Sequence, residues 1–455
     1  MDELDNLYFG NKMSEVADAI RTFPIIYDIT QRELYRKVLD DLKNGIVKEI
    51  DTDLYEAYGN GLRKAVDTVL GESEYGDEYF DMQMQMRANV SRFAAYKAYH
   101  ATQELKDVDP ADIDKKGKLI LNKYNRWQAA EYNTAVARTR TAKQYHDFTS
   151  DPISNELYPN IKWLPSRSAS PREAHRVFWN RVWAKNDPFW NSNTPGSLWN
   201  CKCDWEETDE PVTDKNPNGT MSSKGLDGNP AVTGKVFTDD CPYVKKGGKI
   251  VADFWEPIEQ HHNDYLKYLK DTDYHDVDFN WNGGMKATHN EHNFDPKKGH
   301  YEKDVCDVGF NNGHSVIFTS EFSNIIYKKF TEGLWDNKKF EIAGCETATT
   351  NNVLRGLKHC ASKRETDIAV IYYPKGGFDQ EVFNKAVERY KGLEPKQDGQ
   401  YLKFDKIICV ENNEIVFERS HRGHCREPGH RPYRPPTPGT NPAHWSRSRR
   451  RSNRC

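Results

Sequence analysis

The sequence predicts a multi-domain protein with a mainly α-helical N-terminal domain, an α+β C-terminal domain and a disordered basic tail. Three observations support this prediction. Apolar residues recur at helical spacing over the first 150 residues. Beyond residue 278, short runs of β-branched and aromatic residues alternate with amphipathic stretches. The segment 422–455 has nine Arg, six Pro and one Glu, and is too polar to form a core.

The composition limits the class of protein. A length of 455 residues leaves room for about two to four domains, and no apolar run approaches the roughly 18 residues of a membrane span. The acidic start MDELDNLYFGNKM lacks a signal-peptide pattern, and nine cysteines cannot all pair. We therefore expect a cytoplasmic protein with mostly free thiols and no membrane span. The net charge of −4 divides into +8 in the tail (nine Arg, one Glu) and −12 elsewhere.

Residues 1–215 are predicted to form the helical domain. Apolar side chains at four-residue steps indicate a first helix that carries Leu34, Val38 and Leu42. Further helices are expected over 55–70, 78–103 and 116–148.

A Trp-rich segment, residues 163–213, ends this domain. It holds six Trp, two Phe, one His and a Cys-Lys-Cys triplet. Such a density of residue types that prefer burial indicates a rigid, packed cap that closes the helical domain.

The Cys-Lys-Cys triplet offers a metal site. Cys201 and Cys203, with His175 upstream, supply three ligands of the kind that tetrahedral zinc takes, and Cys241 or Asp204 could be the fourth. The alternative is a pair of buried free thiols. A structural zinc is thus one of two open interpretations.

Residues 216–277 are predicted to be a linker. The stretch TDKNPNGTMSSKGLDGNPAVTG is rich in Gly, Asn, Pro and Ser and has little to bury. A short helix is expected around Ile258–Lys270. His261 and His262 point about 100° apart on such a helix, so we expect them at the surface rather than on one ligand.

Residues 278–421 are predicted to form the α+β domain. Its elements are expected in the order helix (301–310), strand (HSVIFTSE), strand (KKFEIAGCE), basic helix (TTNNVLRGLKHCASKRE), apolar strand (DIAVIYYP), helix opened by Asp379, and a hairpin about Glu411-Asn412-Asn413.

Four motifs of the first domain occur together: RANVSRFAAYKAYHAT, EYNTAVARTRTAKQYHDF, PSRSASPREAHRVFWNRV and DPFWNSNTPGSLWNCKCDWEETDEP. Over residues 30–215 this series resembles the phage Mu F-like head-morphogenesis (minor head) proteins. The resemblance implies a minor capsid component in the virion, made in the bacterial cytoplasm. Its partners would be the portal and other capsid proteins.

The order of elements in the second domain resembles the C-terminal toxin ribonucleases of contact-dependent inhibition and polymorphic toxin systems, the barnase, EndoU, colicin and RelE-like group. The matching positions are His300, Glu302, Gly313–Val316, Glu341, Thr349–Asn352, Arg355–Lys363 and Ile368–Tyr372. The resemblance implies an endoribonuclease with tRNA as its usual target and a cognate immunity protein.

Metal-independent RNA cleavage needs a base, an acid and cations around one phosphate. No cofactor is then required for catalysis. Candidates for the catalytic groups are His359, Arg355, Lys363, Glu341, Thr349 and His300. Candidates for phosphate or RNA binding are Thr350 and Asn351 at the N-terminus of the basic helix, and Lys358 further along it.

Three alternatives stay open. A metal nuclease of the restriction-endonuclease type would use Asp336 and Glu341, but Ala343 stands where such a site has Lys. The basic helix face could simply be solvated, in which case the second domain would bind portal, scaffold or DNA without catalysis. The Arg-rich tail fits a nucleic-acid-binding arm or a non-native extension.

Overall fold

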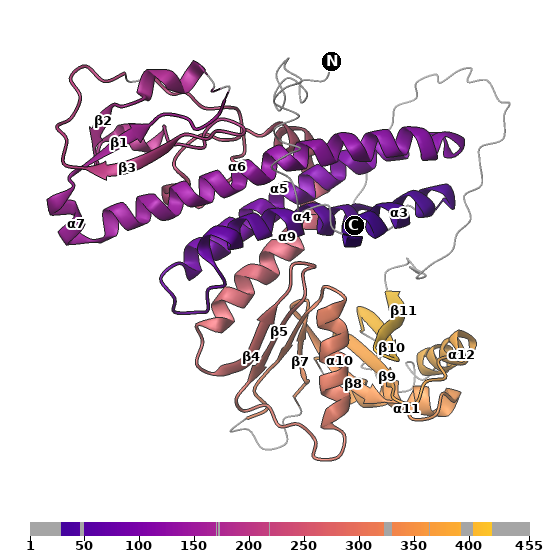
Figure 1. Ribbon diagram of the computed structural model, residues 1–455. Coiled ribbons are helices and arrows are strands. Elements are labelled where there is room, and N and C mark those ends of the chain that lie inside the picture. Colours follow the sequence, from indigo (N-terminus) through magenta and orange to yellow (C-terminus); the bar gives the residue numbers. More distant parts are fainter. Residues whose placement is uncertain are drawn as a thin grey trace, which may run out of the picture.

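The computed structural model describes residues 29–45, 50–169, 171, 173–217, 219–322, 330–363, 365–392 and 404–420. The tail, 422–455, lies outside these ranges. Within them a helical N-terminal part is followed by an α+β part, so the predicted fold class is confirmed (Figure 1). None of the described helices is both long and apolar enough to cross a membrane.

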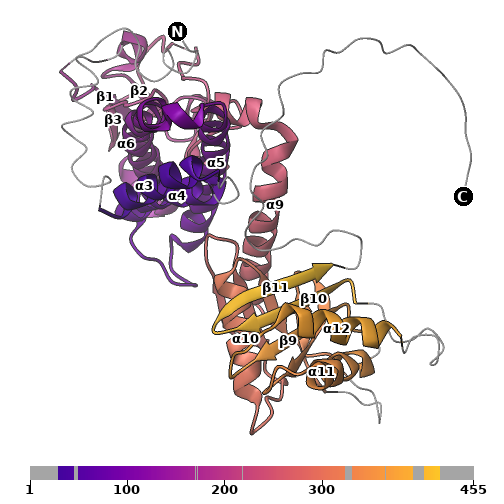
Figure 2. The same cartoon turned by 90° about the vertical axis from the view of Figure 1, so that its right-hand side faces the viewer.

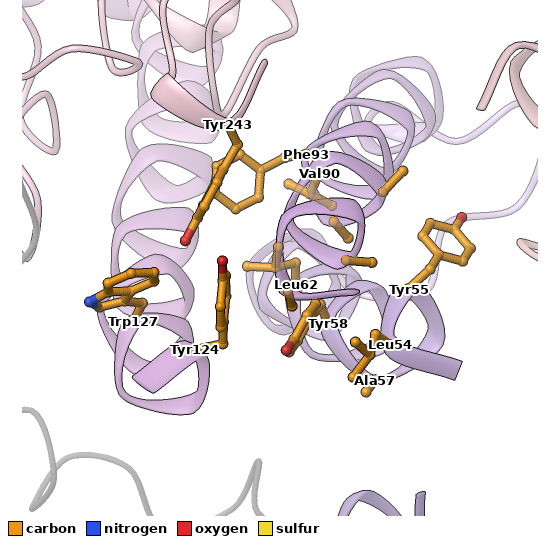
Figure 3. Close-up of a cluster of buried hydrophobic side chains, with 14 of the residues drawn as sticks. Leu54, Tyr55, Ala57, Tyr58, Leu62, Val90, Phe93, Tyr124, Trp127 and Tyr243 are labelled. Atoms are coloured by element: carbon orange, nitrogen blue, oxygen red, sulfur yellow. The ribbon is translucent and has the colours of Figure 1, made fainter. Parts of the chain in front are cut away.

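The helical body is built from four helices: α3 (Ile29–Lys43), α4 (Ile50–Leu70), α5 (Phe80–Lys106) and α6 (Lys118–Ser150). Short helical turns lie beside them: η1 (Pro110–Asp112), η2 (Ile113–Gly117) and α7 (Pro152–Leu157). All four predicted helices are confirmed. Their apolar faces meet in a core of aromatic rings, among them Tyr58, Phe93, Tyr124, Trp127 and Tyr243 (Figure 3).

A Trp-rich lobe, residues 160–213, packs beside the end of α6. Its three antiparallel strands, in the order β2-β1-β3, are β1 (Asn160–Leu164), β2 (Val182–Ala184) and β3 (Asp204–Thr208). Two short helical turns, η3 (Glu173–Phe178) and η4 (Pro188–Asn191), connect them. Four of its Trp are almost completely buried in one cluster: Trp163, Trp183, Trp190 and Trp205. The predicted packed cap is present, and it contains a small sheet that was not predicted. Strands this short leave no clear alternation of apolar and polar residues in the sequence.

The predicted linker is wrong. Residues 219–241 pack into the helical body, where Leu226, Val236 and Phe237 are buried. The guanidinium of Arg138 on α6 donates to the carbonyl of Leu226 at 2.7 Å and also to those of Gly228 and Lys235. Glycines of this segment adopt left-handed turns. The buried guanidinium of Arg138 provides hydrogen bonds to backbone carbonyls that would otherwise lack a partner. The four-residue α8 (Pro230–Thr233) lies in this segment.

The predicted short helix is also wrong in length: α9 (Pro242–Leu269) has 28 residues and joins the two domains (Figure 2). Trp255 and Ile258 on it belong to the core of the helical body, whereas Tyr265 packs on the C-terminal sheet. His261 and His262 are buried at this junction, contrary to expectation. His261 donates from Nδ1 to the Gly283 carbonyl at 2.7 Å, and the ring of His262 stacks on the indole of Trp281.

The C-terminal domain has one eight-stranded sheet, in the order β11-β10-β9-β8-β7-β6-β5-β4. Its strands are β4 (Tyr274–Phe279), β5 (Met285–His289), β6 (Ser315–Phe318), β7 (Gly333–Trp335), β8 (Lys338–Gly344), β9 (Ile368–Tyr373), β10 (Lys406–Glu411) and β11 (Glu414–Ser420). The parallel pairs β5/β6, β8/β9 and β9/β10 are connected by α10 (Gly299–Asn311), α11 (Thr350–Ser362) and α12 (Gln380–Lys391). Every predicted element is present; β4, β5 and β7 were not predicted.

Helices cover both faces of this sheet. Val305 and Val308 on α10 pack against one face, together with Phe340 of β8. Leu357 on α11 and Phe383 on α12 pack against the other. Successive side chains of a strand point to opposite faces, so Glu341, next to Phe340, faces α11. This alternation positions the site described next.

Candidate functional site

A pocket of about 570 Å³ lies at one end of the central strands. Strand β6 ends and strand β7 begins at this end, because Phe318 pairs with Gly333. The first turn of α10 arrives there as well. Five carboxylates and four basic side chains line the pocket. Six of these residues are called the acidic pocket: Glu302, Glu332, Glu341, Arg355, His359 and Lys363.

Glu341 is the innermost group of the acidic pocket. Its side chain is fully buried on β8, 3.0 Å from Nε2 of His359 and 3.4 Å from Nζ of Lys363. Both contacts are close, yet neither carboxylate oxygen accepts a hydrogen bond of good geometry. A buried carboxylate in this state is costly, so an added cation at this position would be stabilising.

Glu332 lies across from Glu341 on the β7–β8 hairpin. Gly333 pairs with Phe340, and continuing this register by one residue brings the two carboxylates to neighbouring positions. Burial raises the pKa of the Glu332 carboxyl to about 8, and the charges of neighbouring carboxylates, Glu341 first, add to the shift. The pocket therefore concentrates more negative charge than its own cations offset.

His292 adds an imidazole to this cluster. Its Nδ1 lies 3.2 Å from the carbonyl of Thr319 and must donate to it, which leaves Nε2 as an acceptor in the neutral ring. That atom nevertheless faces two carboxylates, Glu302 at 3.4 Å and Glu332 at 4.0 Å. A metal ion on Nε2, or a proton carried by Glu332 with its raised pKa, would resolve the conflict. His292, Glu321 and Glu332 offer ligand atoms within 4.8 Å of one another.

Four of the predicted catalytic residues meet in this pocket. His359 and Lys363 both contact Glu341, and Arg355 lines the opening one helical turn before His359. The structure thus brings together the group that the face of α11 predicted. It adds Asn352 from the first turns of the same helix.

Five other predicted residues do not line the pocket. Thr349 is the N-cap of α11, where its Oγ1 accepts from the backbone N–H of Asn352 at 3.3 Å. Asn351 accepts from Arg389 at 3.0 Å and so faces α12. Thr350, Lys358 and His300 are also outside the lining, and the ring of His300 packs against its neighbour Tyr301.

Glu332 was not predicted, and Asp336 was named only for the alternative metal nuclease. Asp336 sits in the turn at the far end of the hairpin, where its Oδ2 accepts from Nδ1 of His314 at 2.8 Å. The turn residues Asp336 and Asn337 both have positive φ, as a two-residue hairpin turn requires. Recognition of this turn in WDNKK would have fixed the register and placed Glu332 opposite Glu341.

A second cluster, the sulfur site, lies in the Trp-rich lobe. His175, Cys201 and Cys203 come together as predicted, with Nδ1 3.4 Å from the first sulfur and 3.7 Å from the second. A hydrogen bond from the Cys203 thiol lowers the pKa of Cys201 well below its usual value, and the nearby imidazole of His175 lowers it further. The seven described cysteines are all free thiols.

Neither predicted fourth ligand reaches this site. Cys241 is buried in the core of the helical body. Asp204 is already engaged, since its Oδ2 accepts from Arg167 at 2.7 Å.

The chain matches no family model, no curated protein and no solved structure.

Proposed function

We propose that the C-terminal domain is a nuclease that hydrolyses phosphodiester bonds in the acidic pocket, with a divalent cation held by Glu302, Glu332 and Glu341. The observation that carries this proposal is that three carboxylates, with side chains 12%, 13% and 0% exposed, line one pocket. Oxygen ligands of this kind suit Mg²⁺ or Mn²⁺. The raised pKa of Glu332 and the unsatisfied oxygens of Glu341 both point to a missing positive charge.

The lysine of this site comes from a different element than expected. Ala343 occupies the position on β8 at which a metal nuclease of the restriction-endonuclease type has its Lys. Lys363, just beyond α11, instead places its Nζ 3.4 Å from the Glu341 carboxylate. Ala343 therefore does not argue against a metal nuclease, because Lys363 supplies the ammonium group.

The remaining residues have distinct roles in this proposal. A bound divalent ion would neutralise charge on the phosphate and lower the pKa of bound water. Lys363 stabilises the negative charge that develops on the phosphate. Arg355, exposed at the opening, binds the phosphate in the bidentate manner of guanidinium groups. His359, 55% exposed and held by Glu341, is positioned to protonate the leaving oxygen.

Metal-independent RNA cleavage is the second candidate, and the His359–Glu341 contact favours it. The carboxylate of Glu341, 3.0 Å from Nε2, orients the imidazole, and the other ring nitrogen is then the base that takes the proton of a ribose 2′-OH. This is the chemistry that the resemblance to toxin ribonucleases implies, with tRNA as its target. It needs no cofactor, and it cannot act on DNA, which has no 2′-OH.

Cleavage assays on the full chain separate the candidates. The metal mechanism predicts that EDTA abolishes cleavage, that Mg²⁺ or Mn²⁺ restores it, and that Glu332→Gln is inactive. The metal-independent mechanism predicts activity on RNA alone, unaffected by EDTA, with 2′,3′-cyclic phosphate products. Glu388→Gln, an exposed carboxylate on α12, is the matched control. Nucleic acid left intact under every condition would refute both and favour a domain that only binds portal, scaffold or DNA.

We also propose that the N-terminal part places this nuclease in a phage particle as a minor head protein. The four motifs over residues 30–215 support this, and they imply the portal and other capsid proteins as partners. Mass spectrometry of purified particles tests it: the chain should be present at few copies per virion. Growth arrest on expression, relieved by a small gene directly downstream, would identify the immunity protein. Particles without the chain would contradict the proposal.

A further inference from the structure

We infer that the Trp-rich lobe binds one zinc ion through Nδ1 of His175 and the sulfurs of Cys201 and Cys203, with water as the fourth ligand. The three side chains come from η3 and from the segment leading into β3. They are separated in the sequence, so their convergence is a property of the folded lobe.

The distances fit zinc. Zn–N and Zn–S bonds of about 2.0–2.1 and 2.3 Å at tetrahedral angles place nitrogen and sulfur about 3.5 Å apart. The two distances from Nδ1 of His175 are 3.4 Å to Cys201 and 3.7 Å to Cys203. All three ligand atoms lie within 4.8 Å of one another. An ion fits at their centre with only small side-chain movements.

The tautomer of His175 also fits. Its Nε2 lies 2.9 Å from the carbonyl of Met221, and a carbonyl can only accept, so Nε2 carries the hydrogen. The unprotonated Nδ1 then faces the two sulfurs. A ligating histidine that donates its other N–H to a carbonyl is the usual arrangement around protein-bound zinc. The ring is 1% exposed and packs edge-on against Trp163, which fixes its orientation.

Two buried indole groups lie beside Cys203. The indole N–H groups of Trp163 and Trp179 are buried and donate no hydrogen bond of good geometry. Without a metal ion, the neighbouring Cys201 and burial raise the pKa of the Cys203 thiol, whereas the two nearby indoles act in the opposite direction. N–H groups directed at a metal-bound thiolate stabilise its negative charge, and such a contact would give both indoles a hydrogen-bond partner.

The fourth position faces solvent. Within the described residues no further His, Cys, Asp or Glu joins the three ligands. Both cysteines line a hollow of about 260 Å³ with Arg167, Asn200 and Asp204, which is roomy enough for water. The ion would tie η3 to the strand end beside it and so close the loop that contains β2 and η4. A three-stranded lobe of this size is of the kind that a metal commonly stabilises.

Zinc content of the full chain is the first test. Protein purified without chelator from zinc-supplemented cells should carry one zinc per chain at the sulfur site. Cys201→Ser, Cys203→Ser and His175→Gln should each bind that zinc at least tenfold more weakly. Cys345→Ser is the matched control, since it removes a buried thiol from the other domain and keeps a donor for the Thr347 carbonyl. Wild-type protein without zinc, or unchanged zinc in all three variants, would overturn the inference.

A second measurement on the wild-type chain does not depend on whether variants fold. Cobalt exchanged for zinc should show the sulfur-to-metal charge-transfer absorption of a thiolate-bound ion. This absorption separates the sulfur site from the acidic pocket and from the surface group Glu78, His146 and Asp147. Cys201 and Cys203 should resist alkylation until a chelator is added, as followed on their peptide. Cobalt binding without thiolate absorption, or alkylation at equal rates with and without chelator, would contradict the site.

Discussion

The sulfur site and the acidic pocket differ in the atoms that they offer to a metal ion. The sulfur site presents two sulfurs and one nitrogen from a short stretch of chain. The acidic pocket presents carboxylate oxygens from three separate elements, with cations beside them. Soft ligands favour zinc, whereas oxygen ligands favour Mg²⁺ or Mn²⁺. The first cluster therefore suits a structural ion, and the second suits chemistry on phosphate.

The largest effect is expected at the centre of the acidic pocket. Glu341→Gln keeps the shape of the side chain but removes the charge that holds both the cation and the contacts to His359 and Lys363. We expect cleavage to fall by at least about a hundredfold. Initial rates at saturating Mg²⁺ measure this, with circular dichroism to confirm the fold. Activity within threefold of wild type would remove Glu341 from the mechanism.

The next largest effect is expected from metal removal at the sulfur site. Zinc present at about a hundredfold over its dissociation constant contributes about 2.7 kcal/mol to the free energy of unfolding. Chelation should therefore lower the thermal midpoint of the Trp-rich lobe by roughly 5–10 °C. The fluorescence of the six tryptophans of this segment reports the transition. An unchanged midpoint after complete chelation would show that no ion supports the lobe.

An effect of similar size should appear in the pH dependence of stability. The pKa of Glu332 is raised to about 8 from an ordinary 4.5, so the folded state holds its proton more tightly and loses stability as pH rises from about 4.5 to 8. Glu332→Gln removes this penalty. At pH 9 without metal, the variant should be more stable than wild type by about 2–4 kcal/mol.

Denaturant unfolding at pH 4 and pH 9 measures that difference. The two proteins should have similar stability at pH 4, where Glu332 is protonated in both states. Glu388→Gln, on an exposed carboxylate of α12, should show no such gain at pH 9. A Glu332→Gln variant that is no more stable than wild type at pH 9 would mean that the pocket does not concentrate negative charge.

The smallest effect is expected when one site is changed and the other is measured. The two clusters lie in different domains, and changes at sites without shared partners usually act independently. Cys203→Ser should leave the cleavage rate of the folded chain within about twofold of wild type. A large loss of cleavage would mean that the Trp-rich lobe takes part in the reaction or holds the substrate.

The features that could be predicted from the sequence are those with a local signal. The sulfur site was found because Cys-Lys-Cys is a local signal, and α11 was found because its N-cap Thr349 and apolar face are contiguous. Glu332 was missed because its role depends on the register of a strand of only three residues. The segment before α9 was misread because the cation that satisfies its carbonyls, Arg138, comes from a distant helix. Local signals were sufficient for elements, whereas contacts between elements were not predictable.

The most direct test is a crystal of the full chain soaked in Mn²⁺. Anomalous scattering should place an ion in the acidic pocket with oxygens of Glu302, Glu332 and Glu341 as ligands. The same pocket of Glu332→Gln should bind it weakly. A well-ordered pocket without a manganese peak, in a protein that still cleaves RNA in EDTA, would contradict the metal mechanism and leave the His359–Glu341 pair as the catalytic centre.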